Sequence, residues 1–497
     1  MNGEELLKAL EEYAGSRDQF SLREFRDWCC PDHDIRTLLV QLLPALSRKR
    51  LGWRGSGRDY HVFRVPPRKE IGTAPDNATA PALWRPDLTG LPEIIEEYIG
   101  HKTQKPWNDP VTLQRIRAAV MQQKGQYWKE GDSRRIGYRK GYAVIAYLAY
   151  HALVSCAQFQ HAFMMLVRDG LIPAQARILD VGTGPGVVPL AIAACARRLS
   201  GFSAEIFCLE RSDEFLEAYR FLLPRYLATE PGITWYPPVQ GDLRNAESLL
   251  LPSSLDLIVL QNVTNELVQE SAIERAGRIR MFARLLVPGG CMVIIEPAEL
   301  RNATALREMV QAAIGPDLQV HSPCTFLWGG SCGADRCWSF VEKPPLSPTR
   351  LMRALAGDHE GYRFLNTDIK FSYAVLVNDG RKRHQYTIPH GSHLIRLSAL
   401  KTRLGRHVQV AGSLMSADLG EGKTHVYLFC DGTSRQPVYV VIPHFHLSAK
   451  NQILLSLPYG SIVGISDALV RFNQKHGAWN LFLTRRSRVT PISRAPE

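Results

Sequence analysis

A glycine-rich turn beside a carboxylate is the first feature of this sequence that suggests chemistry. The turn reads Asp-Val-Gly-Thr-Gly-Pro-Gly and supplies Asp180, Gly182, Gly184 and Gly186. Glycines let the backbone adopt positive φ angles and approach a ligand closely. A helix predicted to begin just after the turn leaves its first N–H groups unpaired at the same place. The pattern therefore predicts a nucleoside-cofactor site.

A second carboxylate, Glu210, ends the next apolar run, at residues 206–209. An acid at this position can accept hydrogen bonds from both hydroxyls of a ribose. NAD and S-adenosylmethionine (SAM) both carry such a ribose, but NAD sites favour the spacing Gly-x-Gly-x-x-Gly. Here Asp180 precedes the first glycine, and its charge suits a cationic, amino-acid-bearing ligand better than a pyrophosphate. The turn resembles the first motif of class I SAM-dependent methyltransferases, and a turn that binds nothing is the alternative.

The elements that must position these residues are predicted to form a doubly wound, Rossmann-like α/β sheet. Asp242 follows a short strand, and residues 254–260 form a buried strand that ends just before Asn262. Ligands in such sheets bind beyond the carboxyl ends of the strands. We therefore expect Asp180, Glu210, Asp242 and Asn262 on one rim, with Asp242 near the adenine.

The segment after the strand at residues 254–260 contains no evident catalytic residue. It reads Gln-Asn-Val-Thr-Asn-Glu. It lacks the Asn/Asp-Pro-Pro-Tyr/Phe turn of amino-methylating nucleic-acid enzymes and the Pro-Cys nucleophile of cytosine C5 enzymes. Asn262 or Glu266 is able to hydrogen-bond a substrate, but neither is an evident base or nucleophile.

A second candidate site is the glycine-rich loop at residues 321–345. It contains Cys324, Cys332 and Cys337. Thiolates in an irregular loop can converge on zinc or on an iron–sulfur cluster. The spacing Cys-x7-Cys-x4-Cys matches neither a zinc ribbon nor a ferredoxin. A fourth ligand must come from elsewhere, either from nearby His321 or from distant Cys430.

Three features together carry a more specific resemblance. A predicted strand ends in Glu296-Pro297, the cysteine loop follows, and residues 370–376 read Lys-Phe-Ser-Tyr-Ala-Val-Leu. This succession resembles the methyltransferase-like assembly factors of the small ribosomal subunit, which occur in mitochondria and have bacterial and archaeal relatives. The resemblance covers roughly residues 120–380, plus Cys430.

The resemblance implies an iron–sulfur protein that contacts ribosomal RNA. In that family four cysteines hold a [4Fe–4S] cluster, and the matching positions here are Cys324, Cys332, Cys337 and Cys430. Trp338 stands where the family usually has His. The family contacts small-subunit rRNA during assembly, and methyl transfer is inferred from its fold. Zinc remains the alternative metal.

Flanking regions add further expected domains. The predicted organisation is a winged-helix-like domain at 1–66, a linker at 67–92, a helical region at 93–170, the methyltransferase-like domain at 171–394 and an OB-like β-barrel at 395–497. The helical region interleaves aromatic residues with the cations Arg134, Arg135, Arg139 and Lys140. Cations can neutralise phosphates while rings stack on unpaired bases.

The composition favours a cytoplasmic protein that binds nucleic acid. The formal net charge is +12, and the ten cysteines are scattered rather than arranged as a disulfide framework. No apolar run is long enough for a membrane span, and the acidic start fits neither a secretory signal nor a mitochondrial presequence.

The sequence thus predicts a cytoplasmic SAM-binding protein that acts on small-subunit rRNA. One rival is a tRNA or small-molecule methyltransferase with incidental cysteines. Another is a binding protein that has lost methyl transfer.

Overall fold

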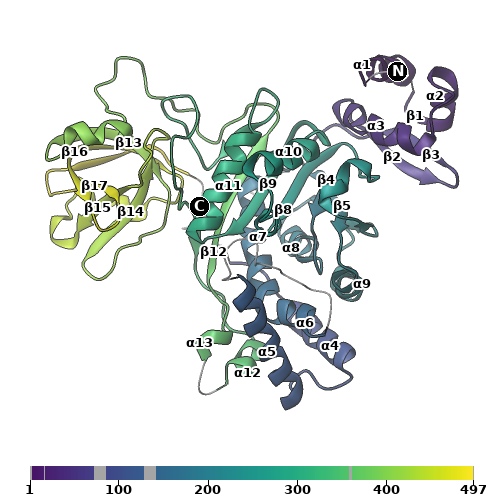
Figure 1. Ribbon diagram of the computed structural model, residues 1–497, viewed down its shortest axis with the longest axis horizontal. Helices are drawn as coiled ribbons and strands as arrows, with labels where there is room; N and C mark the ends of the chain where they lie inside the picture. Colours follow the sequence, from purple (N-terminus) through teal and green to yellow (C-terminus); the bar gives the residue numbers. More distant parts are fainter. Residues whose placement is uncertain (1–2, 16, 72–84, 128–140, 358–360, 496–497) are drawn as a thin grey trace. The chain divides into compact units, whose positions relative to one another are not determined.

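The N-terminal region folds into three helices and a small sheet. The computed structural model describes residues 3–15, 17–71, 85–127, 141–357 and 361–495. The first elements are α1 Gly3–Ala14, β1 Gln19–Ser21, α2 Leu22–Cys29, α3 Ile35–Arg48, β2 Leu51–Ser56 and β3 Asp59–Arg64, with sheet order β1-β3-β2 (Figure 1). Ser21 caps α2 by accepting from the Glu24 N–H, and Asp34 caps α3 in the same way. The expected helices and hairpin are present, and their assignment as a winged helix stays a prediction.

A helical segment precedes the central sheet. Its elements are α4 Leu91–Thr103, α5 Pro110–Tyr127, α6 Ala143–Tyr147, the π-helix η2 Leu148–Ala152 and α7 Leu153–Arg168. Most of α7 is buried, as expected for a helix that is apolar on nearly all sides. The basic residues predicted to meet RNA, Arg134 to Lys140, lie outside the described residues.

The central sheet confirms the predicted Rossmann-like α/β class. Its order is β10-β12-β9-β8-β4-β5-β6, with β7 beside β5 and β11 beside β12. The strands are β4 Gln175–Val181, β5 Ser203–Glu210, β6 Ile233–Trp235, β7 Val239–Gln240, β8 Leu255–Gln261, β9 Leu286–Pro297, β10 Gln319–Ser322, β11 Val341–Lys343 and β12 Ile369–Val377. β4 pairs in parallel with both β5 and β8. Its residues after Gln175 are buried, which explains the continuous apolar runs in the sequence.

Helices connect these strands. They are α8 Val187–Ala196, α9 Asp213–Leu227, α10 Ala272–Ala283, α11 Leu300–Ala313, α12 Arg350–Ala356 and α13 Gly361–Phe364. Chain contacts divide the molecule into two units, residues 1–293 with 345–368 and residues 294–344 with 369–497. The division falls inside β9. Every helix among the described residues is too short or too polar to cross a bilayer.

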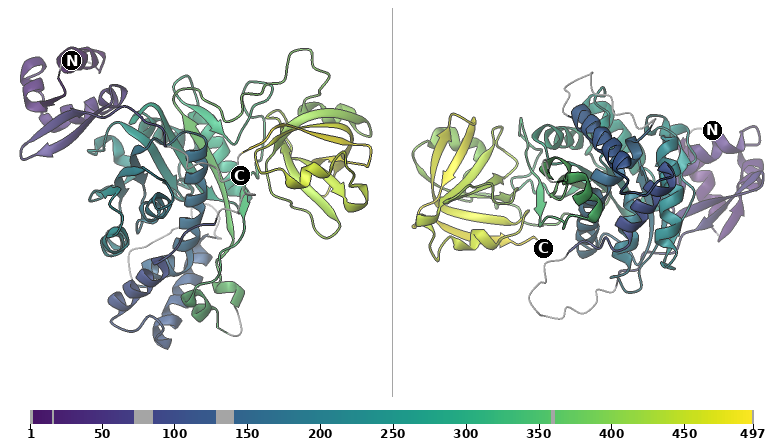
Figure 2. Two further views of the ribbon diagram at one scale, coloured as in Figure 1. Left: turned by 180° about the vertical axis from the view of Figure 1, so that it is seen from behind. Right: turned by 90° about the horizontal axis from the view of Figure 1, so that it is seen from below.

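The C-terminal region contains a closed five-stranded barrel, as predicted. Its strands are β13 His407–Leu414, β14 Thr424–Cys430, β15 Val438–Pro443, β16 Ile462–Asn473 and β17 Ala478–Phe482, and β18 Arg488–Ser493 joins the edge of β16. The order β13-β14-β15-β17-β16 closes by pairing of β16 with β13 (Figure 2). β15 and β17 run parallel, and the other pairs are antiparallel.

Alternating apolar residues fill the barrel. Val410, Phe429, Val440 and Leu481 are almost fully buried in one cluster. For the segment between β15 and β16 the sequence predicts a short helix at residues 447–455. This prediction is wrong, because the structure has two 3₁₀ turns in the segment, η6 His444–His446 and η7 Gln452–Ser456. Asn451 explains the break, because its buried side chain donates to the carbonyls of His446 and Thr484 and anchors the segment to a turn.

Candidate functional site

The three glycines of the turn serve different purposes. All have positive φ: +74° at Gly182, +55° at Gly184 and +92° at Gly186. A Cβ on Gly182 would lie 2.7 Å from Val263 Cγ2, and one on Gly186 would lie 2.2 Å from Leu223 Cδ1. No heavy atom of the described residues lies within 4 Å of a Cβ built on Gly184. Gly182 and Gly186 are therefore needed for packing, whereas Gly184 faces open space that a ligand can enter.

Glu210 ties the turn to the end of β5. Its Oε2 accepts from the Gly184 N–H at 2.8 Å, and its Oε1 accepts from the N–H groups of Arg211 and Ser212 at 2.9 and 2.8 Å. Burial raises the pKa of Glu210, and these three backbone donors oppose the rise. The structure thus brings Glu210 and Gly184 into direct contact.

Asp180 is a buried carboxylate with an unused acceptor. It is 1% exposed, and Oδ2 has no hydrogen-bond partner among the described residues. Burial raises the pKa of Asp180 to about 7; Thr183 opposes the shift and the charge of Glu210 adds to it. The carboxyl is therefore partly protonated at neutral pH, and a cation placed beside it would favour ionisation.

An arginine that the sequence analysis missed lies between two of the predicted acids. Arg211 Nη1 is 3.5 Å from Asp242 Oδ2, and its Nη2 is 3.4 Å from Glu266 Oε2. Asp242 also caps a 3₁₀ helix by accepting from the Arg244 N–H at 2.9 Å. Arg211 could have been found from the sequence, because it directly follows Glu210. A residue next to an acid at the end of a strand lies at the same rim of the sheet.

Asn262 contacts helix α7. It has φ of +56°, and its Nδ2 lies 3.4 Å from Ser155 Oγ. The neighbouring Gln261 donates to the Ser155 carbonyl at 2.8 Å. Ser155 lies in α7, just after the π-helix η2, and π-helical turns occur frequently at functional sites. Asn262 is thereby held at the end of β8.

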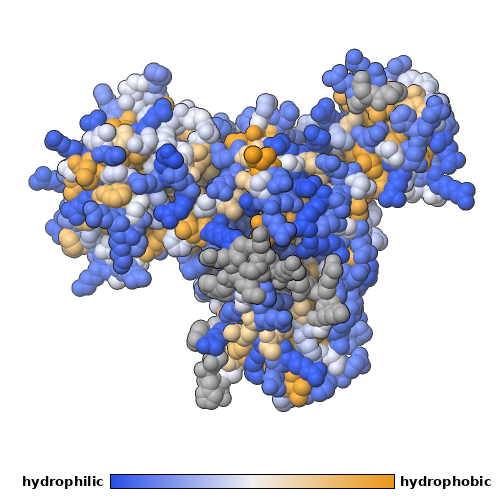
Figure 3. Space-filling view, in the orientation of Figure 1, coloured by the Kyte–Doolittle hydropathy of each residue, from blue (hydrophilic) through white to orange (hydrophobic). Residues whose placement is uncertain are grey.

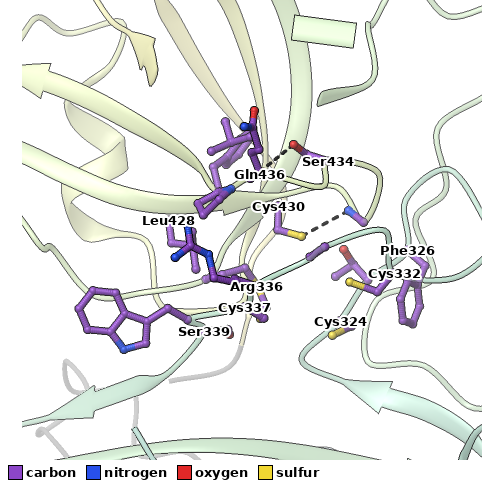
Figure 4. A pocket seen from close by; sticks show the side chains of 18 residues that line it. Cys324, Phe326, Cys332, Arg336, Cys337, Ser339, Leu428, Cys430, Ser434 and Gln436 are labelled. Carbon is purple, nitrogen blue, oxygen red and sulfur yellow. Dashed lines mark hydrogen bonds between the residues drawn. The ribbon is translucent and has the colours of Figure 1, made fainter. Parts of the chain in front are cut away.

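The four predicted metal ligands line one cavity. Cys324, Cys332, Cys337 and Cys430 all border a space of about 640 Å³ that includes its open mouth. Figure 4 shows the sulfur atoms of Cys324, Cys332 and Cys430 turned toward this space. His321, the other candidate, does not line it, and its ring instead contacts Ser322 Oγ at 3.3 Å.

Backbone pairing explains how distant Cys430 reaches the loop. The Gly333 N–H donates to the Gly432 carbonyl, and the Asp335 N–H donates to the Arg435 carbonyl, both at 2.9 Å. The loop is also fixed to α11, where Gln311 accepts from the Cys332 N–H at 3.1 Å. The turn after β14 and the cysteine loop therefore form one wall of the cavity.

Burial disfavours ionisation of two of these thiols. Burial raises the pKa of Cys324 to about 12 and raises that of Cys430 well above its usual value. Within the described ranges, no three His, Cys, Asp or Glu side chains form a group that could hold a metal ion. The cysteines share a cavity without forming a single-ion site.

A buried arginine accompanies these cysteines, and the sequence analysis did not single it out. Arg307 on α11 is 4% exposed, and none of its three side-chain nitrogens has a hydrogen-bond partner among the described residues. Burial lowers its pKa, but nearby Cys324 and Cys337 outweigh this and raise it. A buried cation needs a negative charge nearby. Arg307 therefore favours negative charge on the neighbouring Cys324 and Cys337, and a second arginine, Arg336, lines the cavity itself.

The central sheet gives the fold of this part of the chain. It is a Rossmann-like α/β sheet in which β12 lies between β9 and β10. Solved structures that are similar to parts of this chain include SAM-dependent methyltransferases. One is TrmN from Thermus thermophilus, with 14% identity, 46% of this chain and 53% of that chain covered, and a TM-score of 0.28.

Two other similar structures come from different organisms. Magnesium protoporphyrin IX methyltransferase (ChlM) from Synechocystis PCC 6803 with bound SAH has 10% identity over 55% of this chain and 99% of its own, with a TM-score of 0.29. A SAM-dependent methyltransferase of the DUF858 family from Leishmania major has 14% identity over 54% and 85%, with a TM-score of 0.30.

Sequence comparison gives one family. Residues 398–492 match the C-terminal domain of a family described as a domain of unknown function, DUF8157. A search of curated proteins found no match. The matched segment covers the barrel strands.

Proposed function

We propose that this protein binds SAM at the glycine-rich turn and methylates RNA. The observation that carries the proposal is the combination of Gly184, which faces open space, with the buried acceptor of Asp180 beside it. A nucleoside that carries a cationic amino acid complements both features. Bound SAM supplies an electrophilic methyl group.

The residues on the rim have distinct roles in this proposal. Glu210 orients the ribose while its backbone bonds keep the turn in place. Asp180 balances the positive charge of the methionine part. Asp242 lies toward the adenine, and Arg211 offers a planar cation that can pack on a base.

Asn262 and Glu266 are candidates for holding the methyl acceptor. Both follow β8, at the edge of the sheet where ligands bind. Neither is assigned as a base, and the acceptor itself must supply the nucleophile. In this assignment the protein contributes by positioning the methyl acceptor.

RNA of the small ribosomal subunit is the proposed substrate. The support is the net charge of +12, the resemblance of residues 120–380 to ribosome assembly factors, and an OB-like barrel. Methylation of tRNA or of a small molecule is the alternative, as is binding without methyl transfer.

An iron–sulfur cluster, with zinc as the alternative, belongs to the same proposal. Four cysteine thiolates around a cluster carry a net negative charge, which offsets the buried cation of Arg307. The buried guanidinium of Arg307, which interacts with Cys324 and Cys337, is the specific observation that favours such a group. A cluster of several atoms also suits a shared cavity better than one ion does.

Calorimetry with SAM tests the cofactor. We expect wild-type protein to bind and Glu210→Ala to lose at least tenfold in affinity, because the ribose acceptor and the anchor of Gly184 are both removed. Glu217→Ala, at an exposed position on α9, is the matched control. A wild type with no affinity for SAM would contradict the methyltransferase proposal.

A further inference from the structure

One side of the barrel combines rings and cations. Phe445 is 65% exposed, and its ring lies 4.4 Å from that of His446. The His446 ring meets the edge of Phe482 at 5.7 Å, and the Arg471 guanidinium lies 4.3 Å from the Phe482 centroid. Arg485 donates to the Phe445 carbonyl at 2.8 Å. We call Phe445, His446, Arg471, Phe482 and Arg485 the ring–cation surface.

The surrounding chain is almost free of acids. Residues 432–496 contain eight Lys or Arg and a single acidic residue, Asp467. Asp467 is itself paired with His407 at 2.7 Å. Residues 395–497 have 13 basic and 5 acidic residues, so this region carries +8 of the net charge of +12. Figure 3 shows the barrel, on the face in view, as mainly blue with orange atoms between.

Buried contacts hold the chain segments of the ring–cation surface in place. Asn451 is fully buried, and its Nδ2 bridges the carbonyls of His446 and Thr484 at 3.1 and 3.0 Å. Thr484 precedes Arg485, so the two halves of the surface are joined through one amide. A surface arranged in advance loses less entropy on binding.

We infer that the ring–cation surface binds an unpaired segment of RNA, with bases stacked on Phe445 and phosphates beside Arg471 and Arg485. Exposed rings accept the faces of any base, while arginines neutralise the backbone. Paired bases are already stacked inside a helix and leave Phe445 unused, so a single strand fits better than a duplex. The inference rests on RNA as the proposed partner and states where the barrel meets it.

Fluorescence anisotropy with a labelled oligouridine of about 12 nucleotides tests the inference on the full-length protein. We expect Phe445→Ala to weaken binding about tenfold, which lies within the range for loss of one stacked base. For Arg471→Gln with Arg485→Gln, we expect the slope of log affinity against log salt to fall by about 0.7 per arginine.

Matched variants in other parts of the chain serve as controls. Ile273→Ala removes an exposed apolar side chain that is 72% accessible. Arg220→Gln with Arg284→Gln removes the same charge from exposed positions on α9 and after α10. We expect all of these to keep wild-type binding, and thermal unfolding to be unchanged in every variant.

Several outcomes would overturn the inference. Unchanged binding by Phe445→Ala and by the double arginine variant would do so, as would equal affinity for a duplex of the same length. Binding to phosphatidylserine vesicles but not to oligouridine would replace RNA with a membrane as partner. If SAM does not bind but the variants weaken oligouridine binding as expected, the methyltransferase proposal fails and this surface assignment stands.

Discussion

At the scale of single residues, burial decides what the acids of the rim can do. Asp180 and Glu210 are both nearly inaccessible, yet Glu210 has three backbone donors and Asp180 Oδ2 has no hydrogen-bond partner among the described residues. Removal from water disfavours a charge, and hydrogen bonds restore it. Asp180 is therefore the group whose protonation should respond to a ligand.

SAM binding is expected to depend on pH through Asp180. In the empty protein the pKa of Asp180 is about 7, and a cationic ligand favours the ionised form. Affinity should rise by up to about tenfold per pH unit between pH 5 and 7 and level off above 7, with release of up to one proton. Calorimetry in buffers of different ionisation enthalpy measures this.

Asp180→Asn provides the control for that experiment. The variant should bind SAM more weakly and without the proton release. The raised pKa also means that Asp180 contributes less stability as pH rises from about 4 through 7, because its carboxyl ionises first in the unfolded chain. The empty wild type should therefore lose stability relative to Asp180→Asn over this interval, and a stability difference between the two proteins that stays constant would contradict the assignment.

At the scale of elements, the turn between β4 and α8 shows how packing and binding divide one motif. Gly186 has φ of +92°, and Leu223 and Tyr219 of α9 leave no room for a Cβ. Gly184 also has a positive φ, but a Cβ built on it has no heavy atom of the described residues within 4 Å. The sequence pattern treats these glycines alike, whereas the fold does not.

Two alanine substitutions should separate these roles. Gly186→Ala is expected to destabilise the protein by about 2–4 kcal/mol, since strain adds to a steric clash. Gly184→Ala should cost about 1–2 kcal/mol from strain alone and should weaken SAM binding further. Urea unfolding gives the stabilities, and equal losses for the two variants would refute the distinction.

The cysteine loop is the second element whose role can be tested. We expect anaerobically purified protein to be brown and to contain iron, and Cys430→Ser or Cys337→Ser to lose most of it. The loop should also become less stable, because ligand bonds replace packing there. Cys29→Ser, in α2, is the matched control. Stoichiometric zinc without iron would overturn the cluster, and retention of iron by Cys430→Ser would exclude it as a ligand.

At the scale of the whole molecule, charge is distributed unevenly along the chain. Residues 395–497 carry +8 of the net charge of +12, and a further basic segment, residues 134–140, precedes the sheet in the sequence. Such a distribution attracts nucleic acid irrespective of its sequence. Selectivity must then come from elsewhere in the protein or from the RNA.

Crosslinking of RNA to the full-length protein is expected to enrich small-subunit rRNA over tRNA. The affinity for RNA should also fall steeply with salt, because several cations meet phosphates. Charge reversal at Arg134, Arg135, Arg139 and Lys140 should weaken binding without a change in thermal stability. Enrichment of tRNA would favour the alternative substrate, and no recovery of RNA at low salt would exclude nucleic acid.

The sequence by itself determined the α/β class, the glycine-rich turn and the presence of a C-terminal barrel. Buried parallel strands appear as continuous apolar runs, barrel strands alternate, and caps such as Ser21 and Asp34 act within a few residues. These features depend on local chemistry, so they can be read without coordinates. The 3₁₀ turns at His444–His446 and Gln452–Ser456 were not predicted, because Asn451 bonds to the distant Thr484 carbonyl.

The tertiary structure alone decided which cysteines share a cavity and which charges are buried. Cys430 lies beside the loop of Cys332 because the turn after β14 pairs with that loop, a contact that no spacing encodes. Arg307 reads as an ordinary helix residue until α11 buries it against the cysteines. The pKa of Asp180 likewise depends on exclusion from water by residues far away in the chain. Burial is a property of the assembled fold, since it arises from contacts between segments that are remote in sequence.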